Sequence, residues 1–234
     1  VYDKGKKKDS SIYYYKDLKN RIEIIKYWLE EGEYIEKELS KEGVLKSMRL
    51  LNDNGLKYEK QYYYSDNQKL NIIEEYLNIK GKQYLNQQWH INKRGDTISE
   101  GVNSNIIFSK DTIKLNEPLR AVAYLNVPLF KGKKSKLLLC LPAENSENFH
   151  EDFSNSHEIK LDTFYNLNID TINKKWFPKV DYDKSVVFGK WFNKAGKKYI
   201  RGFLLEYYES NKDSLRRQEF KIYFNKEIYV KDSL

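Results

Sequence analysis

The sequence has little cysteine, little proline and no long hydrophobic run. Its one cysteine, Cys140, excludes an intrachain disulfide and a cysteine-rich zinc or iron–sulfur site. Cys140 stands inside the apolar run of residues 137–141, so we expect a buried side chain rather than a reactive thiol. A membrane-spanning helix needs roughly 20 apolar residues, and this run is far shorter. It predicts a single buried strand instead.

Several enzyme motifs are absent as well. The chain has no Gly-x-Ser-x-Gly elbow, no phosphate-binding glycine loop and no dinucleotide-binding fingerprint. Adjacent carboxylates such as Glu74 and Glu75 would point to opposite faces of a strand, so they cannot readily act as acid and base on one substrate. We therefore expect a non-enzymatic protein without a cofactor.

Aromatic residues and lysine are abundant. The 234 residues include 20 Tyr, 11 Phe and 4 Trp, a content typical of a folded, β-rich protein rather than a disordered one. The net charge of +8 comes mostly from lysine, with dense clusters only at residues 4–8 and 131–136, which we interpret as solvated segments. Because specific nucleic-acid recognition favours arginine, we expect no nucleic-acid partner.

Turn signals recur through the first half of the chain at intervals of 11 to 14 residues. They are Gly32, Gly43, Gly55, Asp66-Asn67, Gly81 and Gly95. This spacing predicts an antiparallel meander with strands of about five to eight residues between the turns. Residues 39–51 and 70–79 also fit a helical stripe, but their tyrosine and isoleucine content and the regular glycines favour strands. Pairing the turns predicts a hairpin repeat of about 22–28 residues.

Two segments carry this repeat most clearly. They are residues 34–56 and residues 62–82. The pattern resembles the divergent MORN-type repeats of the YwqK-like antitoxin family, in which β-hairpins stack in a single curved sheet with aromatic residues near glycine-containing turns. Members of the family occur in envelope proteins as well as in the antitoxin context. The resemblance implies an architecture and identifies no functional residue.

The pattern changes after residues 103–105. Ala121, Ala123 and Leu125 alternate with Val122 and Tyr124, as expected for a strand with one buried face. Further strands are expected at residues 136–141, 185–188, 199–208 and 219–230. Strands with irregular links predict a two-sheet sandwich, and residues 186–208 resemble the closing strands of an immunoglobulin-like domain.

The sequence thus predicts an all-β chain in which an antiparallel meander of repeated hairpins is followed by a β-sandwich. We assign residues 1–12 to a flexible leader, 13–105 to a MORN-like β-hairpin repeat domain and 106–234 to an immunoglobulin-like sandwich. A single continuous β domain is the alternative.

Exposed aromatic residues are the best candidates for binding. We select Tyr62, Tyr64 and Trp89, which could receive a partner protein or stack on a sugar, although cross-strand aromatic pairing within the sheet is the alternative role. His150 and His157 are weak metal candidates. Their spacing lacks the geometry of the His-Glu-x-x-His motif, so we expect a solvated loop at residues 143–156 and no metal.

The first residue of the sequence is Val1 rather than Met, which predicts that a signal peptide, lipoprotein leader or tag precedes it. A lipoprotein leader would tether the protein to a membrane. We expect a scaffold or protein-binding protein in the cell envelope, the periplasm or outside the cell. A glycan-binding module and an antitoxin- or immunity-like protein are the alternatives.

Overall fold

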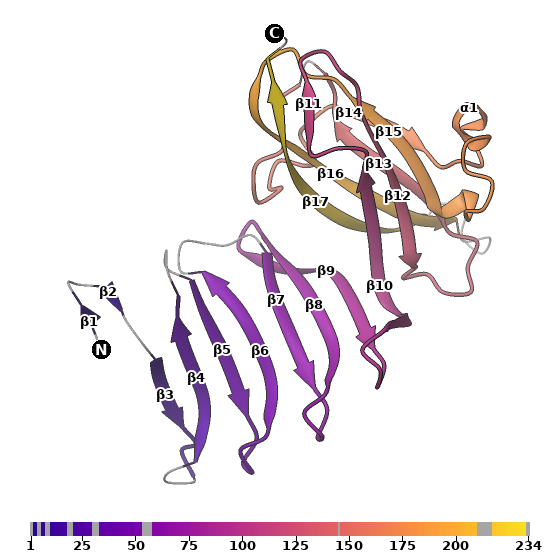
Figure 1. Ribbon diagram of the computed structural model, residues 1–234. Helices are drawn as coiled ribbons and strands as arrows, with labels where there is room; N and C mark the ends of the chain where they lie inside the picture. Colours follow the sequence, from indigo (N-terminus) through magenta and orange to yellow (C-terminus); the bar gives the residue numbers. More distant parts are fainter. Residues whose placement is uncertain are drawn as a thin grey trace. The chain divides into compact units, whose positions relative to one another are not determined.

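The structure is a computed structural model that describes residues 2–3, 6–7, 10–17, 21–29, 33–52, 58–144, 146–209 and 217–232 (Figure 1). The chain divides into two compact units, Val1–Glu100 and Gly101–Leu234. Strands dominate both units, and the described helices are one α-helical turn, α1 (Thr171–Lys174), and one 3₁₀ turn, η2 (Tyr182–Lys184). No helix in the ranges given above is long and apolar enough to cross a membrane. The predicted all-β class is confirmed.

The first unit is an antiparallel meander. Its strands are β1 (Tyr2–Asp3), β2 (Lys6–Lys7), β3 (Ser10–Tyr14), β4 (Ile22–Trp28), β5 (Glu33–Leu39), β6 (Leu45–Asn52), β7 (Tyr58–Tyr64), β8 (Leu70–Ile79) and β9 (Lys82–Ile91). β1 pairs with β2, within the segment predicted to be a flexible leader. From β3 to β9 each strand pairs with the next one in sequence, and Figure 1 shows them as successive arrows of alternating direction.

One turn type recurs at three alternate connections, which follow β5, β7 and β9. The turns begin at Ser40, Ser65 and Asn92, which are 25 and 27 residues apart, in agreement with the predicted repeat. In each, the backbone N–H of the fourth residue donates to the carbonyl of the first, at 2.8–3.0 Å. The fourth residue is Gly43, Gln68 or Gly95, with φ between 60° and 92°, which is the left-handed position of a three-residue hairpin loop. The predicted turns at Gly32 and Gly55 lie outside the described residues.

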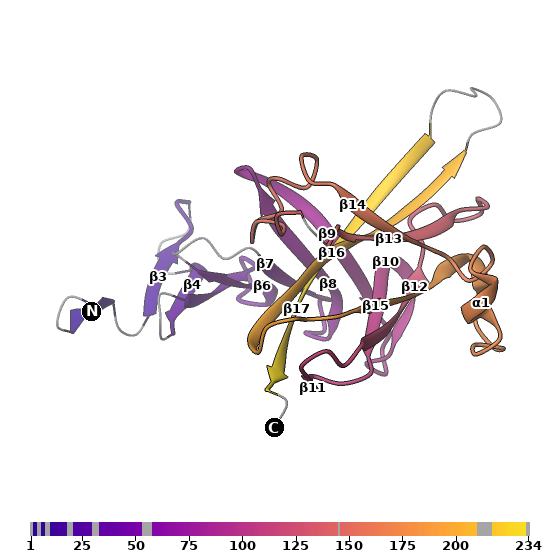
Figure 2. The same cartoon turned by 90° about the horizontal axis from the view of Figure 1, so that it is seen from above.

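The second unit contains two sheets. β10 (Thr97–Phe108) begins in the first unit, so the division at Glu100 falls inside this strand. The other strands are β11 (Thr112–Lys114), β12 (Leu119–Val127), β13 (Lys136–Pro142), β14 (Leu161–Tyr165), β15 (Ser185–Lys190), β16 (Gly196–Glu209) and β17 (Arg217–Lys231). β12 pairs with β10 on one side and β15 on the other, while the second sheet has the order β11-β17-β16-β13-β14. Figure 2 shows β16 and β17 side by side along their length.

The two sheets of the second unit enclose one hydrophobic core, which confirms the predicted sandwich. On β12 the odd-numbered residues from Leu119 to Val127 are buried and face the core, so the strand has the one buried face that its alternation predicted. β15 belongs to the same sheet as β12, and β13, β16 and β17 of the second sheet supply the other side of the core. Leu139, Val186 and Leu204 are all fully buried. Cys140 is 5% exposed, as expected for a small buried side chain.

A second, smaller apolar cluster lies under the segment that follows β13. Phe149 and Phe153 are 1% and 0% exposed, and their rings pack against Phe203 of β16 and Tyr223 of β17. The prediction of a solvated loop at residues 143–156 is therefore wrong. The aromatic partners of the loop are far away in sequence, so its local polarity was misleading.

Candidate functional site

Two of the predicted binding residues, Tyr62 and Trp89, lie in one row across the meander. Tyr62 on β7 is opposite Ile73 on β8, and Ile73 is opposite Trp89 on β9. Directly opposed residues point to the same face of a sheet, so these three side chains are neighbours. Tyr64 is two residues beyond Tyr62 and belongs to the same face. Burial raises the pKa of the Tyr64 hydroxyl, and nearby Tyr62 adds to this rise.

The row extends over all seven strands from β3 to β9. In order it contains Ile12, Ile25, Lys37, Met48, Tyr62, Ile73 and Trp89. The parallel row two residues along each strand contains Tyr27, Ile35, Leu50, Lys60, Glu75 and Gln87. We call the nine apolar or aromatic members of these rows (Ile12, Ile25, Tyr27, Ile35, Met48, Leu50, Tyr62, Ile73 and Trp89) the apolar face. Each of them is partly or largely exposed to solvent.

The opposite surface of the same sheet carries a polar central row. This row contains Lys26, Glu36, Arg49, Gln61, Glu74 and Gln88. The rows on either side of it are mixed: one contains Tyr13, Ile24, Glu38, Ser47, Tyr63, Ile72 and His90, and the other includes Trp28, Tyr34, Leu51, Tyr76 and Leu85. We call this surface the polar face. Lys26 and Glu36 form an ion pair at 3.1 Å, and Ser47 donates a hydrogen bond to Glu38 at 3.1 Å. Amphipathic strands normally cover their apolar side with a second layer, yet here both sides keep solvent contact.

The Glu74 carboxylate is the centre of the polar face. It accepts hydrogen bonds from the hydroxyls of Tyr63 at 2.8 Å and Tyr76 at 2.7 Å, and from the amide of Gln88 at 2.7 Å. Gln88 also contacts His90 Nε2 at 3.1 Å, and His90 Nδ1 lies 3.2 Å from Glu100. These contacts tie four neighbouring strands together, because Tyr63 lies on β7, Glu74 on β8, His90 on β9 and Glu100 in the strand that follows β9. Every donor is used within the sheet, which suits a structural role better than catalysis.

Tyr63 and Tyr76 are expected to make the stability of the meander fall at high pH. Burial, followed by the hydrogen bond to Glu74, raises the pKa of both hydroxyls, that of Tyr76 from 10.0 to about 12. The folded sheet therefore retains these protons above the pH at which the unfolded chain loses them. Their contribution to stability is complete below pH 10 and is lost as the pH rises towards about 12.

Urea unfolding of the wild type and of the double variant Tyr63→Phe/Tyr76→Phe measures this effect. Between pH 10 and about 12 the wild type should lose more stability than the double variant. Tyr165→Phe, which removes a half-exposed hydroxyl from the second unit, is the control. If the wild type and the double variant lost the same free energy of unfolding over this pH range, Tyr63 and Tyr76 would not be the cause of the loss.

His150 and His157 each contact a residue close to them in sequence. His150 Nδ1 lies 3.0 Å from the Ser154 hydroxyl, and His157 Nε2 lies 3.0 Å from its neighbour Glu158. The structure brings no group of three or more metal-binding side chains together among the residues that it describes.

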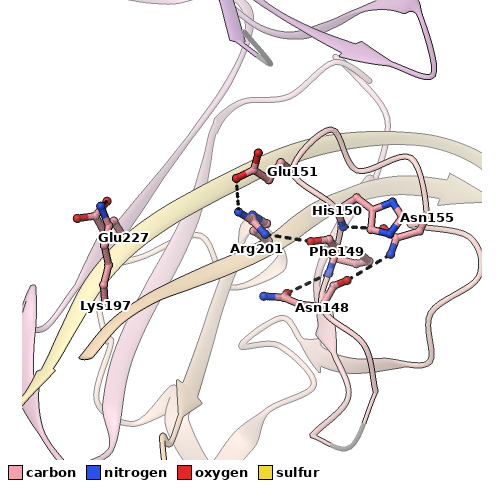
Figure 3. A network of polar contacts seen from close by, with 8 residues as sticks. All are labelled: Asn148, Phe149, His150, Glu151, Asn155, Lys197, Arg201 and Glu227. Carbon is pink, nitrogen blue, oxygen red and sulfur yellow. Dashed lines mark hydrogen bonds and ion pairs between the residues drawn. The ribbon is translucent and has the colours of Figure 1, made fainter. Parts of the chain in front are cut away.

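Arg201 holds the segment around these histidines in place (Figure 3). Its guanidinium donates to the Phe149 carbonyl at 3.1 Å and to the Glu151 carboxylate at 3.2 Å. Within the segment, Asn155 accepts from the His150 backbone N–H at 2.8 Å. The segment therefore has a fixed shape, although its sequence is polar.

The second unit has an exposed apolar surface that the sequence did not reveal. Ile107, Val122 and Val187 are opposite one another on β10, β12 and β15, and they point away from the core. Together with Trp176, which is 70% exposed, they line a hollow of about 660 Å³. The alternation on β12 separated Val122 from Ala121 and Ala123, but only the structure shows that Val122 points outward and that apolar neighbours flank it.

Both units offer accessible surfaces in the described part of the chain. The apolar face brings together Tyr62 and Trp89, which were selected from the sequence, with Ile73 and Met48, which were not. Tyr64 lies on the same side of the sheet, next to these rows. A period-two pattern in β8 and β6 could have identified Ile73 and Met48, but their alignment with Tyr62 depends on strand register. No known protein family, curated protein or solved structure matches this chain.

Proposed function

We propose that this chain is a non-enzymatic scaffold protein that binds another folded protein through the apolar face of its meander. The observation that carries the proposal is the apolar face itself, a pair of cross-strand rows on one side of the sheet. The residues of these rows remain partly exposed to solvent. Exposed apolar surfaces of this extent on soluble proteins mark interaction sites.

The dimensions of the apolar face favour a protein over a small ligand. Seven strands spaced roughly 4.8 Å apart span roughly 30 Å. A sheet of this width is large enough for the surface of about 800 Å² that each partner buries in a standard protein–protein interface. The surface is a row of side chains on a sheet rather than an aromatic-lined groove. A groove would have favoured the glycan-binding alternative.

The charges in the rows indicate the chemistry of the partner. Lys37 and Lys60 are members of the two rows, and the Lys37 ammonium lies 5.0 Å from the Tyr27 ring. Glu75, the acidic member beside Lys60, accepts hydrogen bonds from Asn86 at 2.6 Å and Gln87 at 3.3 Å. We expect a partner surface with apolar residues at its centre and carboxylates that face the two lysines.

An antitoxin- or immunity-like role would be one case of this function, with a toxin as the partner. The envelope or the cell exterior remains our proposed location, supported by the resemblance to MORN-type repeats that occur in envelope proteins.

A matched pair of tyrosine substitutions tests the proposal. Tyr27 on the apolar face and Tyr13 on the polar face are 39% and 48% exposed, and each has a lysine near its ring, Lys37 at 5.0 Å and Lys26 at 5.6 Å. Tyr27→Glu should weaken binding of the partner about tenfold or more, because it places a carboxylate against an apolar and acidic surface. Tyr13→Glu should leave binding unchanged.

The partner is first identified by quantitative mass spectrometry of proteins that the wild type captures from its native host. The purified partner is then titrated calorimetrically against the wild type, Tyr27→Glu, Trp89→Ala and Tyr13→Glu. Loss of affinity in the first two variants alone supports the proposal. Equal affinity for all four proteins would reject the apolar face as the binding site, and a glycan bound in place of any protein would favour the alternative.

A further inference from the structure

A hollow of about 290 Å³ lies in the second unit, between the end of β13 and the start of β16. Its walls come from the segment after β13, from the segment around the end of β15 and from β16. The lining residues that matter here are Glu144, Lys190, Lys197, Lys198, Tyr199 and Arg201. All of them belong to the second unit, and none belongs to the apolar face.

The backbone of β16 has an open edge at this hollow. β13 pairs with β16 only as far as Cys140, which is opposite Phe203. Among the described residues, no strand continues this pairing along residues 197–201. Backbone N–H and C=O groups on such an edge can bond to a molecule in the hollow.

The lining carries an excess of positive charge. It includes four cationic side chains, and Glu144 is its one carboxylate. Two of the cations are paired: Lys197 lies 2.8 Å from Glu227, and Arg201 lies 3.2 Å from Glu151. Lys190 and Lys198 are half-buried residues, and their ammonium groups form no hydrogen bond or ion pair with the residues that the structure describes. An ammonium group without such a partner favours binding of an anion.

Arg201 makes one wall of the hollow rigid. Its side chain is 11% exposed, and its bonds to the Phe149 carbonyl and to Glu151 fix the segment that follows β13 (Figure 3). The Arg201 guanidinium and the Lys197 ammonium lie 5.1 Å and 5.4 Å from the ring of Tyr199. The hollow therefore combines a fixed wall with the two lysines Lys190 and Lys198.

We infer that this hollow binds a small organic anion of monosaccharide size and that Lys190 and Lys198 hold its carboxylate or phosphate group. The volume of about 290 Å³ is just below the roughly 300–1,000 Å³ typical of ligand pockets, so it suits a molecule with a single ring. The lysines act as point charges toward the acid group.

Titration of the full chain with three sugars tests the inference. Glucuronate, glucose 6-phosphate and neutral glucose are added separately, and binding is followed by calorimetry and by backbone amide NMR signals. At least one of the two anions should bind saturably in the millimolar range or tighter and shift the signals of residues 197–201, while glucose should not. Binding of glucuronate would indicate a carboxylate ligand, and binding of glucose 6-phosphate would indicate a phosphate ligand.

Charge variants identify the groups responsible. Lys190→Gln/Lys198→Gln should weaken binding of the anion about tenfold, and Glu144→Gln should strengthen it severalfold because the repulsive carboxylate is removed. Lys179→Gln, which removes an exposed lysine outside the hollow, is the matched control and should have no effect. The opposite effects expected at Glu144 and at the lysines would not arise from general loss of structure.

Three results would overturn the inference. They are the absence of saturable binding of both anions, equal binding of neutral glucose, and affinities unaffected by the lysine variants. Because the apolar face is not involved, none of these results bears on the proposed protein partner.

Discussion

Glu206→Ala is expected to lower the free energy of unfolding of the second unit by about 3 kcal/mol. Glu206 is 1% exposed, and its carboxylate oxygens accept hydrogen bonds from the backbone N–H groups of Leu129 at 2.8 Å and Phe130 at 3.3 Å. Hydrogen bonds to charged groups contribute roughly 1.5–3 kcal/mol each, and alanine also leaves a cavity. Removal of the desolvation cost of the buried carboxylate offsets part of this loss.

Two further variants separate the hydrogen bonds from general effects. Glu206→Gln keeps one acceptor oxygen and should lose about half as much stability as Glu206→Ala. Glu209→Ala removes an exposed glutamate from the same strand and should change stability by less than about 0.5 kcal/mol. Denaturant unfolding followed by tryptophan fluorescence gives all three values. If Glu206→Ala unfolds at the wild-type denaturant concentration, Glu206 does not anchor the segment that contains Leu129 and Phe130.

Gly202→Ala should be the second most damaging substitution, with a loss of about 2–3 kcal/mol. A Cβ atom at Gly202 would lie 2.6 Å from a methyl carbon of Leu141, 2.8 Å from the backbone oxygen of Cys140 and 2.8 Å from the ring of Phe224. Leu141 and Phe224 are side chains that can shift, but the Cys140 oxygen belongs to the neighbouring strand β13. The sheet would have to open between β13 and β16, where the core is closely packed.

Gly189→Ala is the matched control for this prediction. Gly189 also lies in a strand of the sandwich, but the nearest atom to its Cβ position is the Leu119 oxygen at 3.5 Å, an ordinary van der Waals distance. Alanine there should be neutral or slightly stabilising, because glycine loses more conformational freedom on folding. Thermal unfolding of the two variants compares them directly. A similar melting temperature for both would show that the contact at Gly202 relaxes without cost.

These two sites belong to the packed centre of the second unit. Glu206 and Gly202 lie on one face of β16, and each depends on a partner from another part of the chain. The residues proposed for binding are not part of this packed centre. Substitutions at the centre should therefore reduce stability, whereas those at Lys190, Lys198 or the apolar face should reduce binding.

The fold class could be predicted because strand and turn signals are local. Alternation along residues 121–127 predicted a strand with one buried face, since successive residues of a strand point to opposite faces. The turns were found because Gly43 and Gly95 supply the left-handed conformation that a short hairpin loop requires. Such signals depend only on neighbouring residues, so they can be recognised without any knowledge of tertiary contacts.

Strand register could not be predicted from the local sequence pattern. A β-bulge between β8 and β9 puts Glu75 opposite Gln87 and Tyr76 opposite Leu85, with Asn86 as the extra residue. Leu85 therefore points away from the side shared by Gln87 and Trp89, contrary to the simple alternation. A single inserted residue reverses the faces of everything beyond it, and the sequence carries no clear sign of the insertion.

By itself, then, the sequence determined an all-β chain, its repeated hairpins and the alternation that separates buried from outward residues. Only the tertiary structure decided which of those residues meet: Tyr62 with Ile73 and Trp89, Phe153 with Tyr223, and Arg201 with the carbonyl of Phe149. The physical reason is that turns and alternation arise from the chemistry of adjacent residues. Binding surfaces and buried polar contacts instead depend on distant segments, which only the packed sheets bring together.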